Sequence, residues 1–338
     1  MNTILVTGGA GFIGSNFVRY ILNERPEWQV RVLDKLTYAG RLENLADIWD
    51  ESRLRFYKGD ICDAAAVAEA MNGCTQVFNF AAESHVDRSL MSGAEGAGAF
   101  VQTDVFGVYV LLEAARQCGV KKFVQISTDE IYGDVESGQS LETDQLAPRS
   151  PYAAAKAGGE LIARSYFVSH DLPVIITRGS NTFGPYQFPE KLIPLFVTNA
   201  IQDKTLPIYG DGLQRRDWLY VADHCAGILT ASEKGEAGQA YNIGGGNERT
   251  NYEITHRILE LLEKPKSLIE QVADRPGHDR RYALDCAKLK ALGWSPQTSF
   301  ESAMARTVEW YQTRADWWQP IVSGESYKEY YGSNYQAR

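Results

Sequence analysis

Gly8-Gly9-Ala10-Gly11-Phe12-Ile13-Gly14 stands between an apolar run at residues 3–6 and a stretch with helical spacing at residues 12–23. A glycine-rich turn between a strand and a helix lets the backbone come close to a pyrophosphate. The start of the helix adds unpaired N–H groups and a partial positive charge. The turn therefore predicts a dinucleotide-binding unit at the beginning of the chain.

The pattern that follows this turn alternates strand-like with helix-like segments. Apolar runs rich in β-branched residues recur at residues 30–33, 54–57, 76–80, 123–126 and 174–176, with helix-like stretches at 64–71, 100–117 and 152–168. This alternation predicts the α/β class, with a Rossmann-type doubly wound parallel sheet. After about residue 180, Gly and Pro break the chain into shorter elements. We therefore expect a dinucleotide-binding domain over residues 1–180 that carries the catalytic residues. A smaller, mixed α/β lobe is expected over 181–338, and the chain is expected to cross between the lobes.

Charge and cysteine content narrow the possible partners. The 338 residues carry a formal net charge of −9 without a block of Lys or Arg, which argues against nucleic-acid or anionic-membrane partners. The five cysteines are far apart and show no metal or redox spacing, so we expect free thiols in a reducing compartment and no metal site. We expect a cytoplasmic protein. The aromatic run from Trp310 to Tyr335 is expected to pack rather than to bind.

Asp34 ends the second predicted strand, twenty residues after Gly14. A carboxylate at this place accepts hydrogen bonds from the adenosine ribose and repels a 2′-phosphate, which predicts NAD as the cofactor. NADP stays open as an alternative because three cations lie nearby, at Arg31, Lys35 and Arg41. Asp60, after the third strand, is either an adenine contact or an ordinary turn residue.

Tyr152 and Lys156 are four residues apart in a stretch of high helix propensity, so their side chains share one face. An ammonium beside a phenol lowers the pKa of the phenol and favours the phenolate. Such a phenolate can take a proton from a hydroxyl while hydride leaves for NAD. The alternative interpretation is a solvated helix face.

Ser127-Thr128-Asp129-Glu130 follows the predicted strand at 123–126, at the edge of the sheet where α/β proteins bind ligands. Consecutive strand side chains point to opposite faces, so Asp129 and Glu130 share a ligand only if the backbone turns there. Two neighbouring carboxyl groups in a dry cleft resist double ionisation, which gives one protonated acid and one ionised base. Elimination of water needs such a pair, although a solvated acidic loop is the alternative.

Together these segments resemble the extended short-chain dehydrogenase/reductase superfamily and, within it, the dTDP-glucose 4,6-dehydratase family. The resemblance runs nearly from end to end. It is carried by VTGGAGFIGSN at Val6, DKLTYAG at Asp34, AAESHVDRS at Ala81, STDEIYGD at Ser127, SPYAAAKAGGE at Ser150, GPYQFPEKLIP at Gly184, RDWLYV at Arg216, YNIGGGNE at Tyr241 and ADRPGHDRRYALD at Ala273.

The resemblance implies the dehydration of dTDP-glucose to its 4-keto-6-deoxy form. Tyr152 would deprotonate the C4 hydroxyl with help from Thr128, while Glu130 would remove the C5 proton and Asp129 would protonate the departing C6 hydroxyl. A homodimer is implied, with pairing through residues 100–117 and 152–168.

The resemblance also assigns residues to the two ligands. For NAD it implies Gly8, Gly11, Phe12, Ile13, Gly14, Asp34, Lys35, Thr37, Asp60, Ile61, Ala81, Ala82, Tyr152 and Lys156. For the nucleotide sugar it implies Ser84, His85, Asn181, Glu190, Lys191, Leu192, Pro207, Tyr209, Arg216, Asn242, Arg275 and His278. A structural hydrogen-bonding role is the alternative for the two histidines, and an ordinary surface position is the alternative for the two arginines.

Two other functions are compatible with parts of this pattern. A nucleotide-sugar 4-epimerase would share the glycine turn, Tyr152 and Lys156, but it needs neither a C5 base nor a C6 acid. A catalytically silent NAD-binding regulator is suggested by Asp104, where the family generally carries asparagine, and by a glycine-rich segment at residues 91–98.

Overall fold

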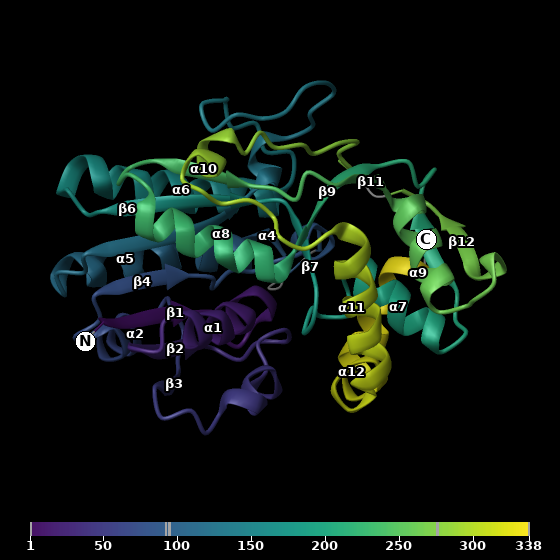
Figure 1. Cartoon of the computed structure of the whole chain (residues 1–338), viewed down its shortest axis with the longest axis horizontal. Helices are drawn as coiled ribbons and strands as arrows, with labels where there is room; N and C mark the ends of the chain where they lie inside the picture. Colours follow the sequence, from purple (N-terminus) through teal and green to yellow (C-terminus); the bar gives the residue numbers. More distant parts are fainter. Residues whose placement is uncertain (1, 92, 94–95, 275–276, 337–338) are drawn as a thin grey trace.

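The computed structural model describes residues 2–91, 93, 96–274 and 277–336. A seven-stranded sheet dominates it, in the order β10-β6-β5-β4-β1-β2-β3, and every neighbouring pair is parallel (Figure 1). The six predicted strands are confirmed, and a seventh comes from the second half of the chain. The strands are β1 (Asn2–Thr7), β2 (Trp28–Asp34), β3 (Leu54–Lys58), β4 (Gln76–Asn79), β5 (Lys122–Thr128), β6 (Val174–Gly179) and β10 (Ala240–Ile243).

Helices cover both faces of this sheet, so the predicted doubly wound fold is confirmed. Successive β1 side chains point to opposite faces, and accordingly Ile4 belongs to one hydrophobic core while Leu5 belongs to the other. The first face is covered by α1 (Phe12–Glu24), α8 (Val221–Lys234) and α10 (Ala287–Ala291); the second is covered by α2 (Ala64–Met71), α5 (Val108–Gln117) and α6 (Pro151–His170).

The predicted helix at residues 100–117 contains an irregularity. It consists of α4 (Ala97–Phe100), a π-helical turn at Val101–Gly107, and α5. π-Helical turns inside α-helices are frequent at functional sites. Here the turn presses the carbonyl of Asp104 so closely against α6 that a Cβ at Gly159 would collide with it.

The second lobe has its own hydrophobic core and its own small sheets. β7 (Asn181–Phe183), β9 (Arg215–Tyr220) and β11 (Glu248–Thr250) form one sheet, and β8 (Leu206–Tyr209) pairs with β12 (Ile269–Val272). The helices of this lobe are grouped away from the central sheet (Figure 1); they are α7 (Leu192–Ile201), α9 (Asn251–Leu261), α11 (Phe300–Thr313), α12 (Ala315–Ser323) and α13 (Glu325–Tyr331).

The remaining elements are short. They comprise α3 (Val86–Ser89), 3-10 turns at Leu42–Ile48, Asp129–Tyr132 and Lys266–Leu268, and a π-helical turn at Gly332–Gln336.

The chain crosses between the lobes more than once. It leaves the central sheet after β6, near the expected boundary at residue 180, but it returns with α8, β10 and α10, whose side chains belong to a core of the first lobe. We therefore propose that the first lobe comprises residues 1–180 together with about 219–243 and 284–294. The crossings place the cleft between the lobes at the carboxyl ends of the strands.

Candidate active site

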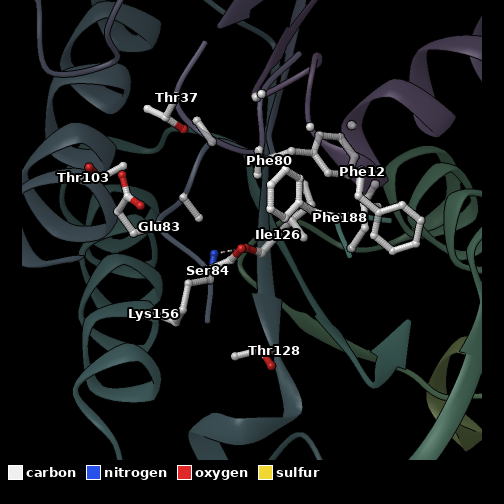
Figure 2. Close-up of a pocket in the computed structure, with 18 of the residues that line it drawn as sticks. Phe12, Thr37, Phe80, Glu83, Ser84, Thr103, Ile126, Thr128, Lys156 and Phe188 are labelled. Atoms are coloured by element: carbon white, nitrogen blue, oxygen red, sulfur yellow. Dashed lines mark hydrogen bonds between the residues drawn. The ribbon is translucent and has the colours of Figure 1, made fainter. Parts of the chain in front are cut away.

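One cavity lies along the carboxyl edge of the central sheet, and both lobes line it. Figure 2 shows Thr37, Thr103 and Glu83 on one side of this cavity and Phe12 and Phe188 on the other. All five predicted catalytic residues and all fourteen predicted cofactor residues are among those that line it. The structure thus brings together groups that are more than a hundred residues apart in the sequence.

The glycine turn forms one end of the cavity. Gly8 has a φ of +66°, and a Cβ there would lie 2.6 Å from the backbone nitrogen of Ala81. A Cβ at Gly14 would collide with the carbonyl of Gly8. Gly11 precedes α1 without a side-chain cap, so the first amides of the helix need another hydrogen-bond acceptor. A pyrophosphate matches this cradle in shape and in charge.

Asp34 lies beside this turn with its carboxylate held in place. Its Oδ2 accepts a hydrogen bond from the backbone of Ala10 (2.9 Å), and its Oδ1 accepts one from the backbone of Leu36 (2.8 Å). Burial raises the pKa of Asp34, and these two hydrogen bonds oppose the shift. The carboxylate has lone pairs left for the hydroxyls of a ribose.

The three cations that kept NADP open as an alternative cofactor bind other groups of the protein. Arg31 donates hydrogen bonds to the carbonyls of Ala70 and Asn72. Lys35 pairs with Asp60 at 2.6 Å, and Arg41 pairs with Glu43 at 3.2 Å. These contacts leave Asp34 as the group that meets a ribose at this place, which favours NAD.

Tyr152 and Lys156 share one face of α6 and line the cavity, as their spacing predicts. The electrostatics differ from the expectation, because the pKa of Tyr152 is raised well above its usual value by burial and by the carboxylates of Glu130 and Asp104. The expected lowering by Lys156 is therefore wrong for the protein without its ligands. The ammonium of Lys156 instead donates to the carbonyl of Ile126 (2.7 Å), and burial lowers its own pKa.

Asp129 and Glu130 follow β5 directly in a 3-10 turn, which confirms the predicted change of backbone direction. Thr128 begins the turn, and its hydroxyl accepts a hydrogen bond from the backbone of Glu130 (3.3 Å). Both carboxyl groups line the cavity together with Tyr152. Burial, followed by the charge of Glu130, raises the pKa of Asp129 well above its usual value. The surroundings of Asp129 therefore favour its protonated form.

The predicted substrate residues divide into three sets. Ser84, Asn181, Glu190 and Lys191 line the cavity, and Arg275 lies outside the described residues. The others do not line it: His85, Leu192, Pro207, Tyr209, Arg216, Asn242 and His278.

Asn242 and Arg216, which the resemblance assigns to the nucleotide sugar, do not line the cavity. The side chain of Asn242 donates to the carbonyls of Ser140 and Asp285 and accepts from the Tyr132 hydroxyl, so it joins backbone segments deep in the protein. Arg216 is buried over the ring of Tyr282, with its guanidinium carbon 4.3 Å from the ring centroid. We infer a structural role for Asn242, while Arg216 stays a candidate because its charge acts on Asp129, which lines the cavity.

Several cavity residues were not predicted, among them Tyr38, Thr103, Ser180 and His224. His224 is buried, which lowers its pKa to about 4, and its Nδ1 lies 2.8 Å from the Thr182 hydroxyl. Neither spacing nor residue type marks these positions. Tyr38 and Thr103 reach the cavity from the loop after β2 and from the π-helical turn, whereas His224 reaches it because α8 returns to the first lobe.

Comparison with known proteins agrees with this geometry. The family model described as GDP-mannose 4,6 dehydratase matches residues 5–307. The chain is 48% identical to dTDP-glucose 4,6-dehydratase 1 of Escherichia coli, covering 99% of both proteins. The chain belongs to the dTDP-glucose 4,6-dehydratase family. It is also 51% identical to the low-salt glycan biosynthesis protein Agl12 of Haloferax volcanii, over 91% of this chain and 98% of that protein.

A solved structure from the dTDP-glucose 4,6-dehydratase family supports the fold and the cofactor. The crystal structure of DesIV from Streptomyces venezuelae, a dTDP-glucose 4,6-dehydratase with NAD bound, superimposes with a TM-score of 0.91. It is 50% identical in sequence, and the match covers 94% of this chain and 99% of that one. The DesIV structure thus shows NAD bound to a member of the same family.

Asp104 departs from the asparagine expected in this dehydratase family. Its Oδ1 accepts a hydrogen bond from the backbone of Glu83 (2.8 Å), while its buried Oδ2 has no hydrogen-bond partner among the described residues. Burial raises the pKa of Asp104 to about 7, with partial compensation from the charge of Lys156. The carboxyl group therefore changes its charge close to neutral pH, and this charge acts on Tyr152 and Lys156.

Replacement of Asp104 by asparagine should change how stability depends on pH. The folded-state pKa lies above the unfolded value, so the folded wild-type chain holds the extra proton, and its stability falls as pH rises from about 4 to about 7. The Asp104→Asn variant lacks this loss. Between pH 5 and pH 8 we expect it to gain roughly 3 kcal/mol relative to wild type, measured by denaturant unfolding at a fixed NAD concentration. Parallel pH profiles for the two chains would contradict the assignment.

Proposed function

We propose that this chain converts dTDP-glucose into dTDP-4-keto-6-deoxy-glucose and water, with NAD as its cofactor. The observation that carries the proposal is the shared cavity of Tyr152, Asp129 and Glu130 beside the glycine turn. A phenol, a protonated carboxyl group and a second carboxyl group are the three proton-transfer groups that oxidation followed by water loss requires. The relatives named dTDP-glucose 4,6-dehydratase support the choice of substrate.

NAD accepts a hydride from C4, donates it later to C6, and contributes the positive charge of its ring. We assign Tyr152 to removal of the C4 hydroxyl proton, with the Thr128 hydroxyl as its hydrogen-bonding neighbour. The raised pKa of Tyr152 shows that burial and the surrounding carboxylates oppose the phenolate. Tyr152 is thus kept as a phenol until positive charge arrives beside it, which ties its activation to cofactor binding.

Glu130 and Asp129 divide the elimination between them. A ketone at C4 acidifies the C5 hydrogen, and Glu130 removes that proton. The electrons released expel the C6 oxygen, which takes the proton of Asp129 and leaves as water. Hydride then returns to C6 and a proton returns to C5, so that the net change is the loss of one water molecule.

Two alternative functions are less consistent with this site. A 4-epimerase has no use for a protonated carboxyl group beside a second carboxyl group, yet Asp129 is buried and its surroundings favour the protonated form. A silent NAD-binding regulator has no use for three proton-transfer groups around one cavity. The dehydratase assignment uses all of them.

Replacement of Glu130 by glutamine should separate oxidation from elimination. The amide keeps the size of the side chain but cannot remove the C5 proton, so 4-keto-6-deoxy product should fall by about 10²-fold or more. Oxidation at C4 should continue, and the absorbance of the reduced cofactor should accumulate in single-turnover mixing. Unchanged product formation would remove Glu130 from this role.

The exposed side of two helices supports a homodimer. The continuous helix 97–117 is long and apolar enough for a membrane span by length and composition alone, a criterion that core helices also meet. It packs on the sheet beside α6, and the outer sides of the two helices expose large apolar side chains, at Val101, Phe106, Tyr109, Leu161 and Val168. We propose that a second copy covers this face, because unpartnered apolar patches mark association sites.

A charged substitution on this face should break the dimer. Leu161 is 53% exposed, so Leu161→Glu should leave the fold intact while placing a charge in the subunit interface. Light scattering should give a dimer for wild type and a monomer for the variant. A monomeric wild-type chain would contradict the proposal.

We place the protein in the cytoplasm, and we propose no nucleic-acid or membrane partner. All five cysteines are free thiols, which suits a reducing compartment.

A further inference from the structure

The aromatic end of the chain packs against the active site. The hydroxyl of Tyr327, in α13, donates a hydrogen bond to the carbonyl of Pro189 (2.8 Å), directly before Glu190. Tyr330, one helical turn later, is also buried. The expectation that this aromatic run packs is therefore confirmed, and the surface that it covers is the back of the cavity wall.

Tyr330 lies against Arg88, which in turn holds Glu190. The guanidinium carbon of Arg88 lies 3.7 Å from the centroid of the Tyr38 ring and 4.7 Å from that of Tyr330, so two aromatic faces enclose it. Its Nε donates to Oε2 of Glu190 (2.9 Å), and the Tyr38 hydroxyl donates to Oε1 of the same carboxylate (2.8 Å). The orientation of the Glu190 carboxylate therefore depends on where Arg88 is held.

Tyr330 also supports a strained residue. His85 has a φ of +146°, a conformation that a non-glycine residue adopts only when its surroundings enforce it. Its Nε2 lies 3.3 Å from the Tyr330 hydroxyl and 3.3 Å from the carbonyl oxygen of Glu190. The preceding residue, Ser84, lines the cavity. The tail and the loop before α7 thus enclose His85 between them.

We propose that Tyr330 is a positioning residue for the substrate site: it holds Arg88 and His85, and through Arg88 it fixes Glu190 against Tyr38 across the cavity. Tyr38 and Ser84 belong to the first lobe, whereas Glu190 and Tyr330 belong to the second. The tail therefore fastens the two lobes around the ligand. This inference rests on the proposed function, because it takes the nucleotide sugar to be the ligand that Glu190 meets.

The test compares Tyr330→Ala and Tyr330→Phe with Glu329→Ala, an exposed control on the same helix. Tyr330→Ala removes the ring over Arg88, so KM for dTDP-glucose should rise by about 10-fold. The kcat should stay within about 3-fold of wild type because Tyr152, Asp129 and Glu130 are untouched. Tyr330→Phe keeps the ring and should restore most of the affinity, and Glu329→Ala should match wild type.

A double-mutant comparison separates positioning from general loss of stability. Arg88→Lys keeps the charge but loses the planar guanidinium that stacks between the rings. If Tyr330 acts mainly through Arg88, adding Tyr330→Ala to Arg88→Lys should raise KM by much less than Tyr330→Ala raises it in the wild-type chain, the remainder being the loss of the His85 contact. Effects that multiply, or a kcat that falls with KM unchanged, would overturn the proposal. If Tyr330→Ala does not fold, Tyr330→Leu keeps apolar volume without an aromatic face and carries the same expectation.

Calorimetric titration with dTDP-glucose distinguishes a failure of the positioning role from a failure of the proposed function. A wild-type chain that binds the sugar nucleotide without converting it contradicts the proposed function alone. Equal Kd values for wild type and Tyr330→Ala contradict the positioning role alone. A wild-type chain that does not bind dTDP-glucose overturns both.

Discussion

Two adjacent carboxyl groups that share one partly buried cavity are the constraint on which the rest of the site depends. Asp129 and Glu130 cannot easily both carry charge there, and burial together with the charge of Glu130 raises the pKa of Asp129 and favours its protonated form. Their common orientation exists only because β5 ends in a 3-10 turn that Thr128 begins. In an extended strand the same two residues would point to opposite faces of the sheet.

The parallel sheet brings the predicted cofactor-binding residues to the same edge as Asp129 and Glu130. Its strands all end at one edge, so the glycine turn after β1, Asp34 at the end of β2 and the acid pair after β5 face one cavity. α6 then brings Tyr152 and Lys156 to the same place. The charge relations follow from this crowding, because burial and the carboxylates of Glu130 and Asp104 raise the pKa of Tyr152 and favour its phenol form. A cofactor that brings positive charge therefore completes the site electrostatically as well as chemically.

Local sequence patterns were sufficient to predict the functional residues within residues 1–180. Each of these groups lies either directly after one strand or on one helix, so its place follows from the neighbouring sequence. The glycine turn, Asp34, the acid pair and the Tyr152–Lys156 spacing all lie where the sequence indicates. The segments that follow residue 180 are different, since their residues are placed by long-range packing. Asn242 bonds to backbone carbonyls instead of lining the cavity, and His224 lines it although nothing in its neighbourhood indicates this. The expected effect of Lys156 on Tyr152 failed because spacing does not reveal that the ammonium bonds to Ile126.

We propose that the groups around one cavity serve both the oxidation at C4 and the removal of the C5 proton. This proposal is tested most directly by mass spectrometry of the product formed from dTDP-glucose in deuterium oxide. Removal and return of the C5 proton at Glu130 predict one deuterium at C5 of a product that is lighter than the substrate by one water, apart from the label. An epimerised sugar without deuterium at C5, or a 4-keto-6-deoxy product that keeps its original C5 hydrogen, would contradict this account.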